Sequence, residues 1–271
     1  MTEWSRYWVL LIGLALVLPG CKHEAEKVPP VPVSKPVNFD HAHPGLGVVL
    51  AKVSDGYGAV DYALLQKDPK PLKAYLDLTA SVPRTQFDGW SKARRMAFLL
   101  NVYNAATLQL MVDHFPVDSI KDIRAVLPVW DLRIISLFGE KYSLGQVEHE
   151  MLRKQFQSPE IHFALVCGSR GCPPLPKEPY TSDRLETQFA EQAQAFLQDK
   201  SKNYVDVDGK QLFLSPIFKW FREDFGKTDQ EIIEFVAGYF PEPEQKALMA
   251  GGFSIAYTKY DWSANIPESE K

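Results

Sequence analysis

The sequence predicts a helix-rich α+β protein, with a single globular domain around a small, mostly antiparallel sheet. A papain-like outline is compatible with that class. Several segments carry apolar residues at helical spacing, and two others alternate like the strands of a hairpin around a glycine turn. No internal repeat and no long linker divides the chain after residue 43, which favours one domain over two.

The composition argues against two classes of partner. The 271 residues are 45% hydrophobic and 24% charged, with a net charge of -4, which is ordinary for a globular protein. No basic block is present that could neutralise phosphates, so we expect no nucleic-acid partner. The chain also has no lysine-rich amphipathic stretch that would hold the folded body on anionic lipid.

Residues 1–20 are typical of a signal peptide, with an apolar run that is short for a membrane span. The ending LVLPGC resembles a bacterial lipobox, with Leu18 three residues and Gly20 one residue before Cys21. This resemblance implies cleavage and lipidation at Cys21, and an uncleaved N-terminal anchor is the alternative. Because Lys22 follows the cysteine rather than aspartate, we expect a lipoprotein on the periplasmic face of the outer membrane.

Residues 21–43 predict a lipidated, proline-rich tether. Four prolines between positions 29 and 36 favour an extended spacer without helical periodicity. His41 and His43 are spaced for metal chelation, but they lie in a predicted linker, so we expect solvated side chains. The globular domain is then expected over 44–266, followed by a tail at 267–271.

A helix is predicted over 70–80, followed by a long helix that Ser91 caps and that ends before Pro116. The long helix is apolar almost all round, so we expect it to be central and buried. Asn101 and Asn104 share one of its faces at i, i+3 spacing. Buried amides need hydrogen-bond partners, so they either brace a loop or line a polar cleft.

Residues 132–144 predict a hairpin that turns at Gly139. Ser143 and Gln146 then form a capping-box pattern that opens a helix over 144–156.

On that helix His149 and Arg153 lie one turn apart, away from the apolar stripe. Arg153 is a candidate binding residue that would position a substrate carboxylate or fix the loop, and the alternative is an ordinary surface or capping salt bridge. The next apolar segment, 161–167, is short and contains β-branched residues, so it predicts a strand within the sheet.

The C-terminal part of the chain predicts three helices and a second hairpin. Ser182 caps a helix that runs to about Leu197, and residues 203–215 form a hairpin with Asp208-Gly209 at its turn. A helix capped by Ser215 follows, with proline at its first position, and a last helix is expected over 230–239.

Five segments of the chain resemble, in order, the blocks of the domain-of-unknown-function family 547. They are RMAFLLNVYNAATLQL, SLGQVEHEMLR, HFALVCGSRGCPPL, LSPIFKWFREDF and IAYTKYDWSAN, and they span roughly residues 90–265. The resemblance implies the domain family but no settled activity. The positions that match the family are Asn101, Asn104, His149, Arg153, His162, Cys167, Cys172 and Pro173.

The segment HFALVCGSRGCPPL suggests thiol chemistry. Cys172 lies in a glycine-flanked loop, and Arg170 could favour its thiolate, which is the nucleophilic form. His149 is the expected base, because His162 would lie at the far end of the predicted strand from the loop. Asn101 or Asn104 could orient the imidazole or stabilise an oxyanion.

Other roles for the two cysteines stay open. Apart from the lipidated Cys21, Cys167 and Cys172 would be the only cysteines of the mature chain in an oxidising compartment, and five residues apart they can form a disulfide. Such a bond would rigidify the loop, or it could be redox-active. No short cysteine–histidine pair resembles a zinc pattern, so we expect no metal and no cofactor.

The sequence therefore predicts an envelope lipoprotein with a candidate cysteine-dependent hydrolase or acyltransferase site. Its substrate would be a peptide, an amide or a thioester. The alternative is a non-catalytic periplasmic module that binds an envelope partner around the same residues, with the two loop cysteines in a structural disulfide.

Overall fold

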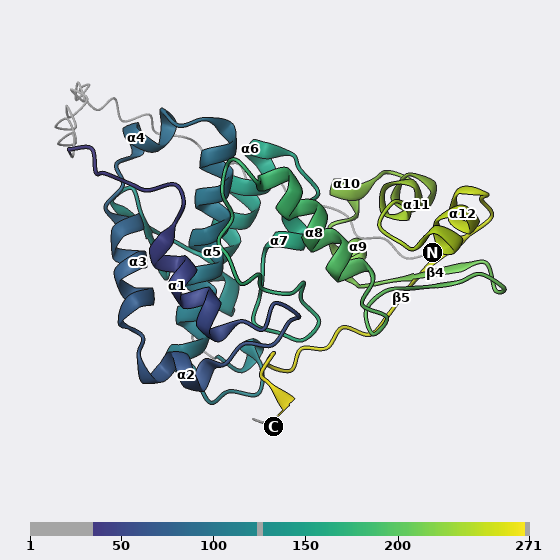
Figure 1. The fold of residues 1–271 in the computed structure, drawn as a ribbon, viewed down its shortest axis with the longest axis horizontal. Coiled ribbons are helices and arrows are strands. Elements are labelled where there is room, and N and C mark those ends of the chain that lie inside the picture. Colours follow the sequence, from purple (N-terminus) through teal and green to yellow (C-terminus); the bar gives the residue numbers. More distant parts are fainter. Residues whose placement is uncertain (1–34, 124–126, 269–271) are drawn as a thin grey trace, which may run out of the picture. The chain divides into compact units, whose positions relative to one another are not determined.

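A 23-residue helix, α5 (Lys92–His114), runs through the larger of two apolar cores (Figure 1). The Oγ of Ser91 caps it by accepting the backbone N–H of Arg94 at 3.3 Å. Nearly every side chain from 96 to 112 is buried, which confirms the prediction of a central helix. The computed structural model describes residues 35–123 and 127–268; the predicted lipidation site, Cys21, lies outside the described residues.

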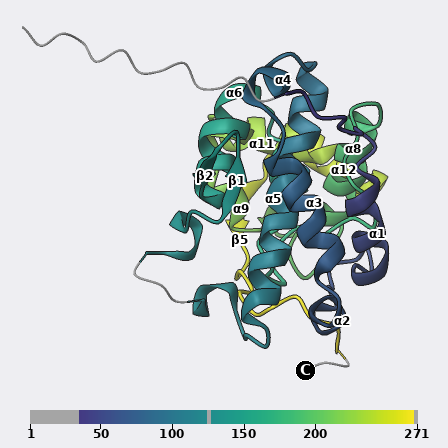
Figure 2. The same cartoon turned by 90° about the vertical axis from the view of Figure 1, so that its left-hand side faces the viewer.

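Short helices precede α5 and pack around it. They are α1 (Pro44–Val53), α2 (Tyr62–Lys67), α3 (Lys70–Ala80) and α4 (Arg84–Asp88). Figure 2 shows α3 lying alongside α5, and the two helices are in contact. The predicted helix over 70–80 is confirmed.

The prediction that His41 and His43 are solvated is wrong for His43. Its side chain is buried, and its Nδ1 lies 2.8 Å from the hydroxyl of Tyr75. Burial, with a smaller contribution from His41, lowers the pKa of His43 to about 4. His43 is buried because of aromatic packing. The ring of Phe39 contacts both His43 and Phe98, which attaches this segment to the core.

The predicted hairpin and capping box are confirmed. Strands β1 (Ile135–Leu137) and β2 (Glu140–Tyr142) pair antiparallel around Gly139, which has a φ of 82° that favours glycine. The backbone N–H of Ser143 donates to the Gln146 side chain, and the Gln146 N–H donates to the Ser143 Oγ, both at 3.1 Å.

The helix that follows this capping box is unusual. Its middle is a π-helix, η3 (Gln146–Arg153), and its end is α6 (Lys154–Phe156). Before the hairpin lie two short 3-10 helices, η1 (Ile120–Asp122) and η2 (Val129–Asp131). A π-helical stretch inside a helix is often found at functional sites.

The predicted strand over 161–167 is wrong, because the segment begins with one helical turn, α7 (Ile161–Ala164). A short apolar run is compatible with either a buried strand or a buried helix. Here the side chain of Asn104 bonds the carbonyl of Ala164 and the N–H of Val166, which holds the end of the turn. An extended segment then leads to Cys167.

A second apolar core lies beyond α7 (Figure 1). Its helices are α8 (Leu185–Leu197), α9 (Ile217–Trp220), α10 (Arg222–Phe225), α11 (Asp229–Ala237) and α12 (Glu242–Met249). Its sheet has the order β3 (Tyr204–Asp206), β4 (Gln211–Leu214), β5 (Ser254–Tyr257). The first pair is antiparallel, as the predicted hairpin required, and β4–β5 is parallel.

Two details of this region differ from the prediction. Ser182 does not cap α8, whose N-cap is Arg184; the Ser182 Oγ donates to Asp183 instead. The helix predicted after Ser215 breaks at Phe221 into α9 and α10. The helix-rich α+β class is confirmed. In the described part of the chain, no helix has the length and apolar character that a membrane span requires.

Candidate functional site

The predicted thiol residues and histidines share the walls of one pocket, which we call the aromatic pocket. Its volume is about 350 Å³. Its aromatic wall consists of Trp130, Trp220, Phe221, Tyr260 and Trp262, and its polar or sulfur groups are Tyr103, Glu148, His149, His162, Cys167 and Cys172. An apolar cavity with a few convergent polar groups is the usual form of a small-molecule site.

Cys167 and Cys172 form a disulfide in the wall of this pocket, with Cα atoms 6.2 Å apart. Cys172 is buried, whereas Cys167 is partly exposed. The sequence left a disulfide open as one of several roles for this pair, and the structure has that bond.

Hydrogen-bond donors converge on the two sulfur atoms. The backbone N–H of Cys167 lies 2.9 Å from the Sγ of Cys172. The hydroxyl of Tyr260 lies 3.3 Å from each sulfur, and that of Ser169 lies 3.1 Å from Cys167 and 3.5 Å from Cys172. Ser169 also donates to the Tyr260 hydroxyl at 3.1 Å, so the Cys167 N–H and the Tyr260 hydroxyl are the donors that would stabilise a thiolate if the bond opened.

Asp224 on α10 connects Arg153 and His162 beside the aromatic pocket. Its carboxylate accepts two hydrogen bonds from Arg153, at 2.6 and 3.0 Å, and one from the Nε2–H of His162 at 2.6 Å. Burial alone would raise the pKa of Asp224, but the bonds from His162 and Arg153 hold it below its usual value. Arg153 therefore makes a salt bridge within the chain, which is the ordinary role that the sequence left open for it.

The two histidines differ in which nitrogen is free. The Nδ1 of His149 faces the Arg153 guanidinium at 3.1 Å and must accept from it, because arginine only donates. The Nε2 of His162 donates to Asp224, which leaves its Nδ1 as the basic atom. Burial lowers the pKa of both rings, with Arg153 adding to the effect at His149, so both are neutral at pH 7. His162, and not His149, therefore has a ring nitrogen that is free to accept a proton.

Glu148 is a buried carboxyl group in the same wall. Its Oε2 accepts a hydrogen bond from the hydroxyl of Tyr103 at 3.2 Å. Burial raises the pKa of Glu148 to about 7, against a smaller lowering by the Tyr103 bond. A carboxyl group with a pKa near 7 can both donate and accept a proton at physiological pH.

Asn101 and Asn104 brace loops. Asn101 bonds the carbonyl and the N–H of Tyr180, at 2.8 and 2.9 Å, and Asn104 holds the segment before Cys167 in the same two-bond manner. Of the two roles that the sequence left open, these contacts favour the bracing one.

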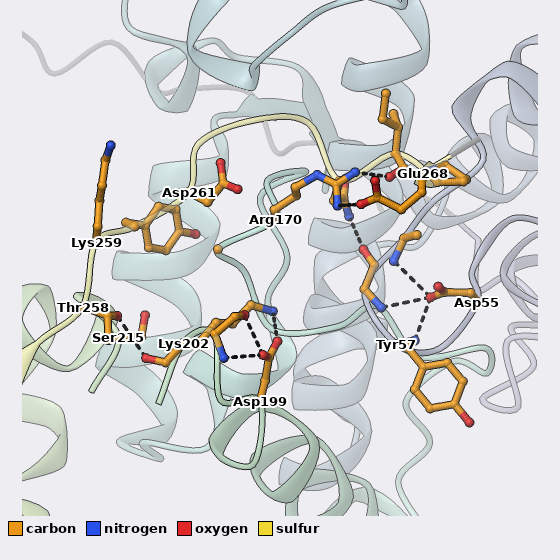
Figure 3. A pocket seen from close by; sticks show the side chains of 18 of the residues that line it. Asp55, Tyr57, Arg170, Asp199, Lys202, Ser215, Thr258, Lys259, Asp261 and Glu268 are labelled. Atoms are coloured by element: carbon orange, nitrogen blue, oxygen red, sulfur yellow. Dashed lines mark hydrogen bonds and ion pairs between the residues drawn. The ribbon is translucent and has the colours of Figure 1, made fainter. Parts of the chain in front are cut away.

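Arg170 lies on the other side of the cysteine loop, in a second cavity of about 620 Å³ that we call the polar pocket (Figure 3). Its guanidinium donates to Glu268 at 3.0 Å and to the carbonyl of Ile266 at 2.6 Å. Lys202 pairs with Asp199 at 3.0 Å and donates to the carbonyl of Cys172 at 2.9 Å. These contacts fix the backbone of the cysteine loop from the side of the polar pocket.

Three residues were not singled out from the sequence: Glu148 and Tyr260, which line the aromatic pocket, and Asp224, which binds His162 beside it. Asp224 and Tyr260 lie in segments that match the family blocks, but 62 and 88 residues from their partners His162 and Cys172. Spacing could not reveal either contact. Among the described residues, no group of three or more histidine, cysteine or acidic side chains could hold a metal ion.

Comparison with known proteins gives one match. Residues 87–197 match the family model described as "Protein of unknown function, DUF547". The matched stretch contains both cysteines, His149 and His162, and it supports the domain family that the sequence blocks indicated. The last two of those blocks, with Asp224 and Tyr260, lie beyond it. No curated protein and no solved structure matches the chain.

Proposed function

We propose that this protein is an envelope lipoprotein whose Cys167–Cys172 pair exchanges between disulfide and dithiol with a thiol-bearing substrate in the aromatic pocket. One observation carries the proposal: two hydroxyls and a backbone N–H converge on the sulfurs within a ligand-sized cavity. A disulfide that only braces a loop needs no such donors, whereas a released thiolate is stabilised by the Cys167 N–H and by the Tyr260 hydroxyl, which Ser169 orients.

The exposure of the two residues favours one direction of attack. A substrate thiolate attacks the Sγ of Cys167, because Cys167 is the more exposed residue of the two. The bond between the cysteines breaks and its electron pair goes to the Sγ of Cys172, which the Cys167 N–H and the Tyr260 hydroxyl stabilise. A second substrate thiolate then attacks the substrate sulfur of the mixed disulfide and releases Cys167 as a thiolate.

The net reaction needs no other reactant. The substrate dithiol is oxidised to a disulfide and the cysteine pair is reduced to a dithiol. A partner that carries a disulfide returns the pair to its starting state by the same exchange in reverse.

Single turnover tests the proposal. The full chain is mixed with an equimolar two-cysteine peptide under native conditions, and both thiol states are read by alkylation and peptide mass spectrometry. We expect the peptide to be oxidised as the pair opens, with the circular dichroism of the protein unchanged. If the pair opens only in denaturant, it is a structural bond and the non-catalytic binding module is the better account.

The lipoprotein part of the proposal rests on the apolar run and the ending LVLPGC before Cys21. Its test is fractionation of cells that express the full chain or Cys21→Ala. We expect the wild type in the outer-membrane fraction and the variant released from it. Equal membrane retention of both would favour an uncleaved N-terminal anchor.

Acyl chemistry by the reduced form is the second candidate, and the His162–Asp224 pair favours it. An Asp-held histidine beside a thiol is the arrangement that cysteine hydrolases use, here with Cys172 as nucleophile. A thioester probe with the reduced chain tests it: His162→Gln should abolish hydrolysis, and His149→Gln should spare most of it. No hydrolysis by the reduced wild type would exclude this candidate.

A further inference from the structure

Glu148 is placed to exchange protons with the cysteine pair. It lines the same pocket as both sulfurs, from the π-helix η3, and its side chain is buried. Its Oε2 receives the Tyr103 hydroxyl, and no described residue donates a hydrogen bond to its Oε1. One oxygen is therefore held in place, and the other is left for a proton or a substrate.

Tyr260 lines the same pocket as Glu148 and contacts the sulfurs. Its hydroxyl lies 3.3 Å from each Sγ. Burial raises the pKa of Tyr260, the Ser169 hydroxyl opposes that rise, and the negative charge of Glu148 adds to it, so the two side chains lie within electrostatic reach. With its pKa raised, Tyr260 stays protonated at neutral pH, and its hydroxyl hydrogen remains available for a hydrogen bond to one of the sulfurs.

The charged and titratable groups around Glu148 come from several elements. Tyr103 on α5 and Arg153 on η3 favour its ionised form, and Asp224 on α10 disfavours it. The two neighbouring histidines, His149 and His162, have lowered pKa values and are already neutral near pH 7. Of these groups, Glu148 is the one whose pKa is raised to about 7, so we expect it to titrate there.

We propose that Glu148 is the proton donor and acceptor of the exchange reaction, and this inference rests on the proposed function. When the disulfide opens, the carboxylic acid of Glu148 protonates the departing Cys172 thiolate, directly or through the hydroxyl of Tyr260. The resulting carboxylate then takes the proton of the second substrate thiol. That thiolate attacks the mixed disulfide and releases Cys167. One proton leaves Glu148 and one returns to it, so the cycle balances.

The test compares the rate at which dithiothreitol opens the native disulfide in the full chain and in Glu148→Gln, across a pH series. The ratio of the two rates cancels the titration of the probe itself. A positioned general acid typically contributes about 100-fold or more, and we expect the ratio to be at least about 10 at pH 6. It should fall through a midpoint near 7, where Glu148 ionises, and approach about 1 above that pH.

Glu150→Gln is the matched control, because this neighbouring carboxyl on the same helix is exposed. Its rate ratio should stay near unity throughout. If the rate ratio for Glu148→Gln does not change with pH, whatever its size, the inference is overturned and the exchange function is left intact. A wild-type disulfide that dithiothreitol cannot open without denaturant would instead remove the proposed function.

Tyr103→Phe provides a second variant that keeps the carboxyl group. The Tyr103 hydrogen bond lowers the pKa of Glu148, so its loss should move the midpoint of the pH profile upward. A change in folding alone would alter the rate without moving that midpoint. An unmoved midpoint would therefore count against Glu148 as the group that titrates.

Discussion

The two pockets on either side of the cysteine loop share Tyr260 but differ in what their charged groups do. In the polar pocket, Arg170 and Lys202 are paired with carboxylates and also bind backbone carbonyls (Figure 3). In the aromatic pocket, Glu148 has one hydrogen bond and His162 keeps a free Nδ1. Paired charges fix the backbone, and the groups left without a full set of partners are those available for chemistry.

The largest expected effect is on stability, at Glu148. A carboxyl group with a raised pKa in the folded state stabilises the protein fully below the unfolded pKa, and this stability is lost as pH rises through the folded pKa. The rise in the pKa of Glu148 from 4.5 to about 7 corresponds to a loss of up to about 3 kcal/mol of stability. Glu148→Gln should therefore raise the free energy of unfolding at pH 8 and change it little at pH 4. Denaturant melts at both pH values measure this, and an equal change at both would contradict it.

An intermediate effect is expected where the two pockets meet. A Cβ on Gly171 would lie 2.8 Å from ring atoms of Tyr260, so Gly171→Ala must displace the ring. Overpacking of this kind costs about 1–3 kcal/mol, and we expect the lower end because a side chain can move. Disulfide opening should slow as the Tyr260 hydroxyl leaves the sulfurs. Gly238→Ala, where no atom lies within 4 Å, is the control. An unchanged opening rate in Gly171→Ala would show that the hydroxyl position is unimportant.

The smallest effect is expected in the polar pocket. Arg170 pairs with the exposed carboxylate of Glu268, and such pairs contribute about 1 kcal/mol or less. Arg170→Ala also removes the hydrogen bond to the Ile266 carbonyl, so we expect a total loss of about 1 kcal/mol of stability in a thermal melt. It should also leave the opening rate unchanged, because the guanidinium lies behind the loop. A rate loss as large as that of Glu148→Gln would mean that the two pockets do not divide structure and chemistry as described.

Several local signals in the sequence were reliable, although the Ser182 cap and the strand over 161–167 were wrong, and contacts across the chain were not predicted. The Ser91 cap, the capping box at Ser143 and the turn at Gly139 each act within a few residues, and each was predicted correctly. The parallel pairing of β4 with β5 joins segments about 40 residues apart, and no local pattern specifies it.

The candidate site divides in the same way. The cysteines and histidines stand out by residue type, and the structure brings them into one pocket. The preference for His149 over His162 depended on a predicted strand that is a helical turn, so its geometric basis does not hold. Asp224 and Tyr260 have ordinary neighbours in sequence, and only the fold brings them to His162 and to the sulfurs.

The reduction potential of the Cys167–Cys172 pair in the folded chain tests the central claim most directly. The protein is equilibrated with glutathione and dithiothreitol buffers, and the dithiol fraction is read by alkylation. Donors that stabilise the thiolate favour the reduced form, so we expect a potential above about −270 mV, as in exchange-active pairs. A value below about −300 mV, as in structural disulfides, would contradict the claim and make the bond a brace for the pocket wall.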